Sequence, residues 1–270
     1  MSEVIQKIMT ALFEFVLTTR VDLVDIPAAG RLIADWARGP RGRMICATNV
    51  HMVMEAYDDP SFGAIVNGAD LVVADGRPIV WACRLLGQRA VAHVRGLDLT
   101  AYLCDLAERE HLNVGLYGGA PATVQKVRMR LLQNYHGLSV THACSPPFRP
   151  LTPEEDAADT QAIRAADVQL LLVGLGCPKQ ERWMATHRDQ LSCAMVGVGA
   201  VFDMLAGQHR VAPLWLQRAG LEWAYRLFQE PRRLWSRYAK HNFRFVLYFG
   251  AQCARKWCGG LVRRDHVRHG

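Results

Sequence analysis

The sequence predicts an α/β fold in which a parallel sheet is covered by helices on both faces. Short, strongly apolar segments such as residues 71–74 and 168–173 are typical of strands buried on both faces. Segments of helical period lie between them, and this alternation is typical of βαβ units. Residues 210–270 differ in composition from the rest, which indicates a helical appendage beside the sheet.

The chain divides into three predicted parts. Residues 1–20 form an amphipathic helix, residues 21–209 the sheet-containing core, and residues 210–270 the basic helical appendage. The apolar run over residues 5–17 is interrupted by Glu14 and is followed by no small-residue cleavage site, so it does not resemble a signal peptide. No apolar run reaches the roughly 20 residues that a membrane helix needs.

The predicted strands and helices follow one another in a regular order. Leu32, Ile33 and Trp36 share the inner face of the first core helix, and Thr152 opens a later helix with acidic residues in its first turn. Pro231 ends one helix of the appendage. Strands are expected at 21–24, 44–47, 71–74, 113–117, 168–173 and 193–198, and helices at 27–38, from 51, from 78 to 86, 121–133, from 152, from 178, 213–229 and 232–249.

Composition excludes several classes of protein. The eight cysteines form no CxxC pair, a pattern that favours free thiols in a reducing cytoplasm over disulfides or a zinc site. The ten histidines contain no HExxH, so we expect no bound metal and no other cofactor. Residues 210–270 hold 13 Lys and Arg against three Asp and Glu, whereas residues 1–209 carry a net charge of −3. The appendage is therefore predicted to meet phosphates, on a lipid surface, a nucleic acid or a diphosphate substrate.

Asp75 is the candidate catalytic residue. It follows the apolar segment 71–74 directly and precedes Gly76, at a turn before a helix that Pro78 can begin. In an open parallel sheet, ligands bind outside the carboxyl ends of the strands, where this turn lies. A carboxylate there can act as a general base. Asp is also a common turn former and helix cap, and that structural interpretation stays open.

Polar residues follow other strands at the same predicted edge. Thr48 and Asn49 come just before a helix, where they can cap it or hold a sugar or a diphosphate. Arg95 can bind a phosphate or carboxylate through two hydrogen bonds, and Asp98 can bind a ligand or cap a helix.

A second group of candidates follows the apolar segment 168–173. Gly174 and Gly176 let the backbone approach a ligand, and the helix begun by Pro178 carries polar groups in its first turn. Those groups are Lys179, Gln180 and Glu181, and Asp203 ends a further predicted loop. Because all these loops follow strands, we expect them to meet at one edge of the sheet.

Several motifs occur in order along residues 20–240 and together resemble a known family. They are Ala47-Thr-Asn49, Ala69-Asp-Leu-Val-Val-Ala-Asp-Gly76, Arg95-Gly-Leu-Asp98, Gly174-Leu-Gly-Cys-Pro-Lys-Gln-Glu181, Val198-Gly-Ala-Val-Phe-Asp203, and Leu221-Glu-Trp-Ala-Tyr-Arg226 with Glu230-Pro-Arg-Arg233. On these motifs the chain resembles the WecG/TagA/CpsF glycosyltransferases, which form glycosyltransferase family 26.

The resemblance implies an activity and a location. It implies that a hexose (N-acetylmannosamine, glucose or N-acetylmannosaminuronic acid) passes with inversion from a UDP-sugar to an undecaprenyl-diphosphate-linked saccharide. The reaction would occur at the cytoplasmic face of the bacterial membrane, in cell-surface polysaccharide synthesis, on a Rossmann-like core of the GT-E class and without a metal. The appendage would dock on the anionic membrane and complete the site with Arg226, Arg233 and Arg237. Gly76 and the polar residues named above would bind substrates, and self-association into a homo-oligomer stays open.

Two other function classes stay open. A NAD-dependent oxidoreductase requires G-x-G-x-x-G after a strand, whereas this chain offers only Gly115-x-x-Gly-Gly119 and Gly174-x-Gly176. The other class is a non-enzymatic protein that binds membranes or nucleic acid through its basic appendage. No recognised nucleic-acid module occurs, and tryptophans stand among the arginines of the appendage, so lipid is the expected partner and nucleic acid is not.

Overall fold

The core is built on one parallel sheet, as the sequence predicts. The structure, a computed structural model, describes residues 12–266, apart from the side chains at 218, 233–234, 236–237 and 259–266. The strands of the sheet are β3 (Arg43–Thr48), β4 (Leu71–Ala74), β5 (Asn113–Gly118), β6 (Ser139–Cys144), β7 (Leu170–Gly174) and β8 (Ala194–Gly197). Their order across the sheet is β4-β3-β8-β7-β5-β6, with every neighbouring pair parallel.

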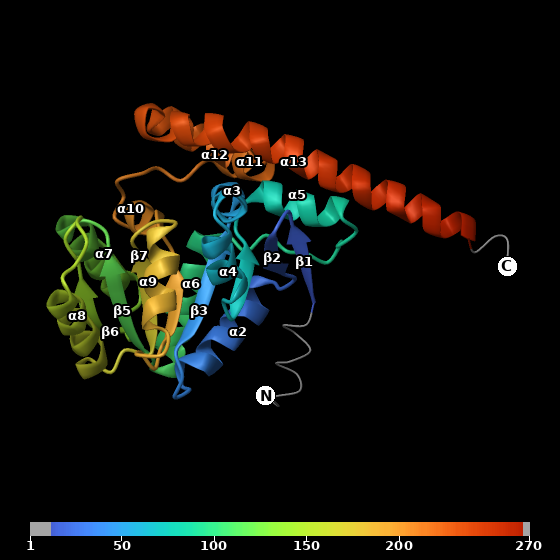
Figure 1. The fold of residues 1–270 in the computed structure, drawn as a ribbon. Coiled ribbons are helices and arrows are strands. Elements are labelled where there is room, and N and C mark those ends of the chain that lie inside the picture. The colour runs from blue at the N-terminus through green and yellow to red at the C-terminus, as the bar shows by residue number, and fades with distance from the viewer. Residues whose placement is uncertain (1–11, 267–270) are drawn as a thin grey trace.

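Helices cover both faces of this sheet (Figure 1). Side chains alternate along each strand, so that Ile45 packs in the core on one face while Met44 and Cys46 pack in the core on the other. The first face is covered by α2 (Ile26–Ala37), α6 (Gly96–Glu110), α7 (Pro121–Asn134) and α10 (Val201–Leu205). The second is covered by α3 (Val50–Asp58), α4 (Pro60–Asn67), α8 (Pro153–Ala165) and α9 (Lys179–His187).

A β-hairpin precedes the core where the sequence predicts the end of a helix. Phe13–Val16 form β1 and Thr19–Asp22 form β2, paired antiparallel through a turn in which Leu17 has a φ of 55°. The predicted helix over residues 1–20 is therefore wrong for residues 13–16 and 19–20, because the pairing of β1 with β2 overrides the helical period. Residues 1–11 of that helix lie outside the described part of the chain.

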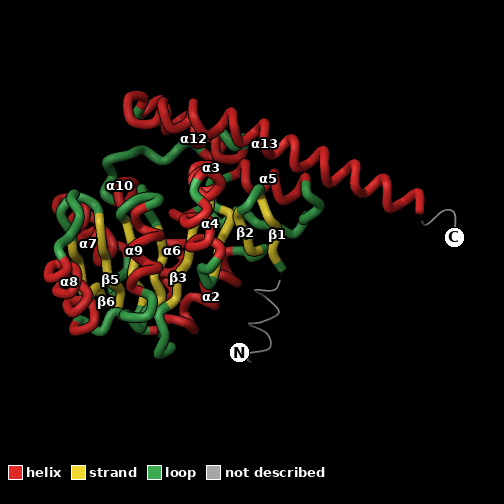
Figure 2. The backbone as a smooth tube through the Cα atoms, in the orientation of Figure 1, coloured by secondary structure: helices red, strands yellow, loops and turns green. Residues whose placement is uncertain are grey.

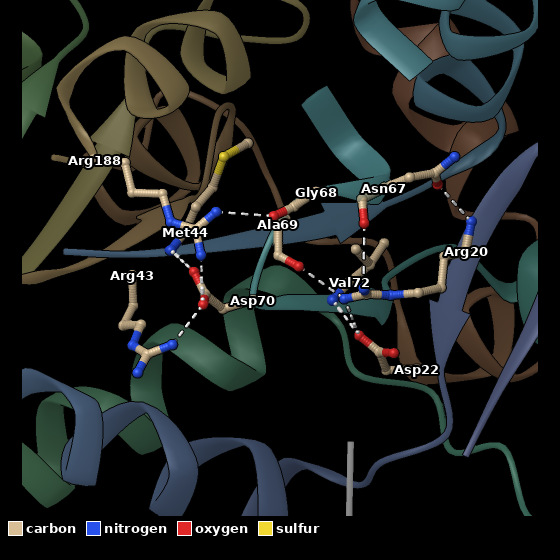
Figure 3. Close-up of polar contacts among 10 residues, drawn as sticks. All are labelled: Arg20, Asp22, Arg43, Met44, Asn67, Gly68, Ala69, Asp70, Val72 and Arg188. Carbon is tan, nitrogen blue, oxygen red and sulfur yellow. Dashed lines mark hydrogen bonds and ion pairs between the residues drawn. The ribbon is translucent and has the colours of Figure 1, made fainter. Parts of the chain in front are cut away.

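Buried carboxylates fix the amino ends of the strands (Figure 3). Asp22 is buried, accepts a hydrogen bond of 2.7 Å from the Val72 N–H and pairs with Arg20 at 3.1 Å. Asp70 pairs with Arg43 at 2.8 Å. Paired in this way, the carboxylates join the hairpin to β4 and β4 to β3, at the end of the sheet opposite to the predicted site.

The appendage consists of three helices. They are α11 (Leu214–Arg218), α12 (Glu222–Gln229) and α13 (Pro231–His266). The predicted single helix over residues 213–229 is wrong, because Gly220 has a φ of 69° and lies so close to Trp81 that an added Cβ would come within 2.3 Å of the indole. Trp81 belongs to α5 (Arg77–Leu85), which follows β4.

The long helix α13 joins the core (Figures 1 and 2). Its Phe245, Phe249 and Cys253 are buried in a third core cluster with residues of the hairpin and α5. The region from α11 to α13 thus lies across the side of the core where α3 and α5 are found.

Candidate active site

Asp75 lies at the carboxyl end of β4, in the turn that leads into α5. Its main-chain N–H donates to the Thr48 carbonyl over 2.9 Å, which ties the turn to the end of β3. The N–H of Gly96, the first residue of α6, donates to Asp75 Oδ1 over 2.6 Å, and His93 Nε2 bonds to the Asp75 carbonyl. These contacts fix the carboxylate at the edge of the sheet where open parallel sheets bind ligands.

The surroundings of Asp75 suit a general base. Burial raises the pKa of its carboxyl above the usual value, and the Glu222 carboxylate raises it further. The Gly96 N–H, His93 and Arg226 act in the opposite direction, and the net pKa is raised. A carboxylate with a raised pKa accepts a proton more readily, which general-base catalysis near neutral pH requires.

Thr48, Asn49 and Gly76 build the turns around Asp75. Thr48 is fully buried, and its hydroxyl donates to the sulfur of Met52 over 3.2 Å. Asn49 caps α3, since its Oδ1 accepts from the Met52 N–H over 3.2 Å, and Gly76 is the N-cap of α5. The capping interpretation of Asn49 is confirmed, and Thr48 faces the interior, where it supports the turn through its main chain.

The loop after β7 supplies the second group of candidates. Gly174 packs so tightly that an added Cβ would lie 2.5 Å from Phe202. Gly176 has a φ of 79° with open space beside it, which leaves its backbone accessible to a ligand. Gln180 is buried and accepts from the Gly176 N–H over 3.1 Å, whereas Lys179 is exposed at the start of α9.

Glu181 is a fully buried carboxyl behind this loop. Its Oε1 accepts from Gln180 Nε2 over 2.7 Å, and its Oε2 has no hydrogen-bond partner among the described residues. Burial raises the pKa of Glu181 to about 7, although hydrogen bonds from Gln180 and Cys177 lower it. Glu181 therefore positions Gln180 and does not itself reach the surface.

The two groups meet across the end of β8. A Cβ placed on Gly96 would lie 3.5 Å from Asp75 Oδ1 and 3.4 Å from Val201, at the start of α10. A Cβ placed on Gly199 would lie 3.5 Å from Gln180 Oε1. Asp203 is half-buried in the same short helix as Val201. The structure therefore places the predicted loops along one edge, formed by the ends of β3, β4, β7 and β8; we call it the carboxyl edge.

Arg95 has a different environment from the predicted one. Its guanidinium donates to both Asp98 oxygens, over 3.0 and 2.7 Å, and to Glu222 of α12 over 2.9 Å. Arg95 is only 15% exposed. Arg95 therefore links α6 to the appendage through Glu222. The carboxylates of Asp98 and Glu222 already occupy the guanidinium that the sequence suggested for a phosphate.

The appendage brings one of the three predicted arginines to Asp75. Arg226, on α12, is close enough to lower the pKa of the Asp75 carboxyl. Arg233 and Arg237 lie on α13, and their side chains are outside the described ones. Among the described side chains of α12, Glu222 and Arg226 are therefore the ones that approach Asp75 at the carboxyl edge.

The surface of the appendage combines exposed apolar side chains with basic ones. Phe228 is 86% exposed and Trp235 is 67% exposed. Two basic side chains of α13 turn toward the core: Arg244 forms two hydrogen bonds to Asp58, of 2.8 and 2.6 Å, and Lys240 lies 3.9 Å from it. Within residues 12–266 no helix is both long and apolar enough to span a bilayer.

One cluster of possible metal ligands was not predicted from the sequence. His51 and Glu55 of α3 lie beside His241 of α13, with ligand atoms within 4.8 Å of one another. In the part of the chain that the structure describes, this is the one group of His, Cys, Asp and Glu side chains that can hold a metal ion. The spacing of His51 and Glu55, four residues apart on a helix, was visible in the sequence, but the third member is 186 residues farther along.

Comparison with known proteins finds similar sequences. A protein of Bacillus spizizenii named N-acetylglucosaminyldiphosphoundecaprenol N-acetyl-beta-D-mannosaminyltransferase is 29% identical over 198 residues, covering 73% of this chain and 75% of the relative. A protein of the same name from Staphylococcus aureus strain MW2 is 29% identical over 191 residues, covering 70% of this chain and 73% of the relative. Residues 15–258 match the model of the WecG/TagA/CpsF glycosyl transferase family, and the chain therefore belongs to that family.

Proposed function

We propose that this protein transfers a hexose, with inversion, from a UDP-sugar to a saccharide carried on undecaprenyl diphosphate. The names of the relatives favour N-acetylmannosamine as the hexose and lipid-linked N-acetylglucosamine as the acceptor. Glucose and N-acetylmannosaminuronic acid are the other two candidates for the transferred hexose. The product would serve the synthesis of a cell-surface polysaccharide such as an exopolysaccharide, a capsule or teichoic acid.

One observation carries the proposal: a carboxylate with a raised pKa lies at the carboxyl edge of a glycosyltransferase-family core, beside an arginine from the appendage. In the proposed step the acceptor hydroxyl attacks the anomeric carbon, its proton passes to Asp75, and the bond to the UDP oxygen breaks. Inversion follows because this is a single displacement. Proton removal by a positioned base contributes typically about 10²–10⁴-fold to the rate.

The departing UDP develops negative charge, which the site must stabilise. We assign this role to Arg226 together with Arg233 and Arg237, and assign no metal ion to the reaction. Gly176 and the first turn of α9, with Lys179, would hold the donor through main-chain and side-chain donors. Gln180 would act by fixing the Gly176 loop, to which it is hydrogen-bonded.

The acceptor is attached to a lipid, so the protein must work at a membrane surface. We assign membrane contact to the exposed apolar side chains of the appendage, including Trp215, Phe228 and Trp235. Ala224, Leu227, Pro231 and Arg232 line an open apolar depression beside the last two. Aromatic side chains next to basic ones are typical of peripheral binding to anionic lipid, here the inner face of the bacterial cell membrane.

The direct test supplies a short-chain prenyl diphosphate bearing N-acetylglucosamine and screens UDP-sugars one at a time. The proposal predicts a product one hexose heavier by mass spectrometry, formed together with UDP. It also predicts that UDP raises the melting temperature and that NAD does not, because a ligand that binds only the folded state stabilises it. Stabilisation by NAD, with no transfer from any UDP-sugar, would contradict the proposal.

A further inference from the structure

The cluster of His51, Glu55 and His241 lies where the appendage meets the core. His51 and Glu55 are one turn apart on α3, with His51 Nδ1 3.8 Å from Glu55 Oε1. His241 comes from α13, and its Nε2 lies 3.3 Å from the same Glu55 oxygen. We propose that these three side chains bind a divalent transition-metal ion of the zinc type, which links α13 to α3.

The spacing of the ligand atoms fits such an ion. Zinc binds imidazole nitrogen and carboxylate oxygen at about 2.0–2.2 Å in a tetrahedral arrangement, which places neighbouring ligand atoms about 3.3–3.5 Å apart. The separations of 3.3 and 3.8 Å in the cluster are close to this value, and all three atoms lie within 4.8 Å of one another. Small rotations of the side chains would complete three sites of a tetrahedron, with water in the fourth.

The burial of His241 supports a metal over a simple ion pair. The residue is 3% exposed, and its Nδ1 has no hydrogen-bond partner among the described residues. A bond from Nε2 to a metal would offset the free-energy cost of burying this ring.

The charged groups around the cluster are compatible with a cation. Lys240 and Arg244 lie near His241 on α13, and both pair with Asp58 of α3. The two-histidine, one-carboxylate set favours zinc and similar transition metals, because magnesium and calcium prefer oxygen ligands alone.

A metal here would act on the geometry of the appendage. Helix α3 begins directly after Asn49, at the carboxyl edge, and α13 follows α12, which carries Glu222 and Arg226 toward Asp75. A link between α3 and α13 would therefore hold the appendage in place over the site, without taking part in the sugar transfer.

The test uses the full chain, stripped of metal with a chelator and titrated with Co²⁺ and then Zn²⁺. We expect one equivalent to bind, with a visible Co²⁺ spectrum of tetrahedral nitrogen and oxygen ligands. Binding should weaken by more than about 100-fold in His51→Gln and in His241→Gln. The matched control is His136→Gln, an exposed histidine outside the cluster, which should bind like the parent.

Two further readouts keep the test decisive. Zn²⁺ should raise the melting temperature and slow proteolysis within α13 in the parent and the control, and do neither in the cluster variants. Circular dichroism identifies folded variants, and Glu55→Gln replaces a histidine variant that does not fold. No binding to the parent, equal binding by the cluster variants, or thiolate charge-transfer bands from cysteine ligation would each overturn the proposal.

Discussion

Two opposing effects act on the Asp75 carboxyl. Withdrawal from water favours its protonated form, whereas the hydrogen bond from the Gly96 N–H at the start of α6 favours the carboxylate. Because burial prevails, we expect the acid limb of the pH profile of kcat/KM to lie above the ordinary pKa of an aspartate, about 3.9. A limb at or below that value would show that Asp75 is not the titrating base.

Glu181 allows a prediction about stability. Its pKa of about 7 in the folded protein exceeds the value of 4.5 for an unperturbed carboxyl, so the folded state keeps a proton that the unfolded state loses. The resulting stability is complete below about pH 4.5 and is lost as the pH rises through 7. Between pH 5 and 8 the free energy of unfolding of the parent should fall, relative to Glu181→Gln, by on the order of 3 kcal/mol.

Denaturant unfolding of both proteins at several pH values measures this difference. Subtracting the free energy of unfolding of Glu181→Gln from that of the parent at each pH removes the contribution of the histidines, which both proteins share. Parallel curves for the two proteins would mean that Glu181 titrates normally and is not buried as described.

At the residue scale, the sequence could identify positions but not their partners. Asp75, Gly176 and Gln180 were predicted from local patterns, a strand end, a glycine pair and a helix start, and they do meet at the carboxyl edge. Arg95 was predicted to be available to a phosphate, yet Glu222 occupies it from 127 residues away. Such a contact depends on how distant helices pack, which one sequence does not reveal.

At the scale of elements, α12 is joined to α6 by the Arg95 to Glu222 pair. Glu222 also raises the pKa of the Asp75 carboxyl. In Glu222→Gln the acid limb of the kcat/KM profile should therefore move to lower pH, and the loss of a largely buried ion pair should reduce stability by about 1 kcal/mol.

A matched variant separates these two effects. Asp98→Asn removes the other carboxylate from Arg95, and Asp98, unlike Glu222, is not among the main causes of the pKa shift of Asp75. The acid limb should stay in place in Asp98→Asn. Equal shifts in both variants would indicate a general loosening of α12 and not a charge effect on Asp75.

Elements were predictable where their pattern is local. The fully apolar strands β4 and β7 and the helix α2 follow the predicted ranges within a few residues. The strand β6 was missed, because it forms the edge of the sheet and carries mixed polar residues such as His142. The hairpin strand β1 was mistaken for part of a helix, since its stability comes from pairing with β2.

At the scale of the whole molecule, the appendage has two kinds of surface. Phe245 and Phe249 bury their rings in the core, whereas Phe228 and Trp235 leave theirs exposed. Removing residues 209–270 would therefore uncover part of the core as well as abolish membrane contact, so point substitutions test the membrane function better.

We predict that the double variant Phe228→Ser, Trp235→Ser binds anionic vesicles at least about tenfold more weakly than the parent. Each large apolar side chain contributes about 1.5–3 kcal/mol on burial, and 1.4 kcal/mol corresponds to a factor of ten. Vesicle co-sedimentation measures the change. Phe148→Ser is the control, since Phe148 is 81% exposed but lies in the loop after β6. Unchanged binding by the double variant would place the membrane contact elsewhere.

The central claim is that Asp75 takes the proton from the acceptor hydroxyl, and one measurement tests it most directly. The single-turnover rate of hexose transfer to a short-chain prenyl-diphosphate acceptor is compared between the parent and Asp75→Asn, with Asp105→Asn of the exposed face of α6 as control. The Asn oxygen can still accept from the Gly96 N–H, so the fold should persist. We expect the rate to fall about 10²–10⁴-fold in Asp75→Asn and to stay near the parent rate in the control. A folded Asp75→Asn protein that transfers the sugar at the parent rate would contradict the account.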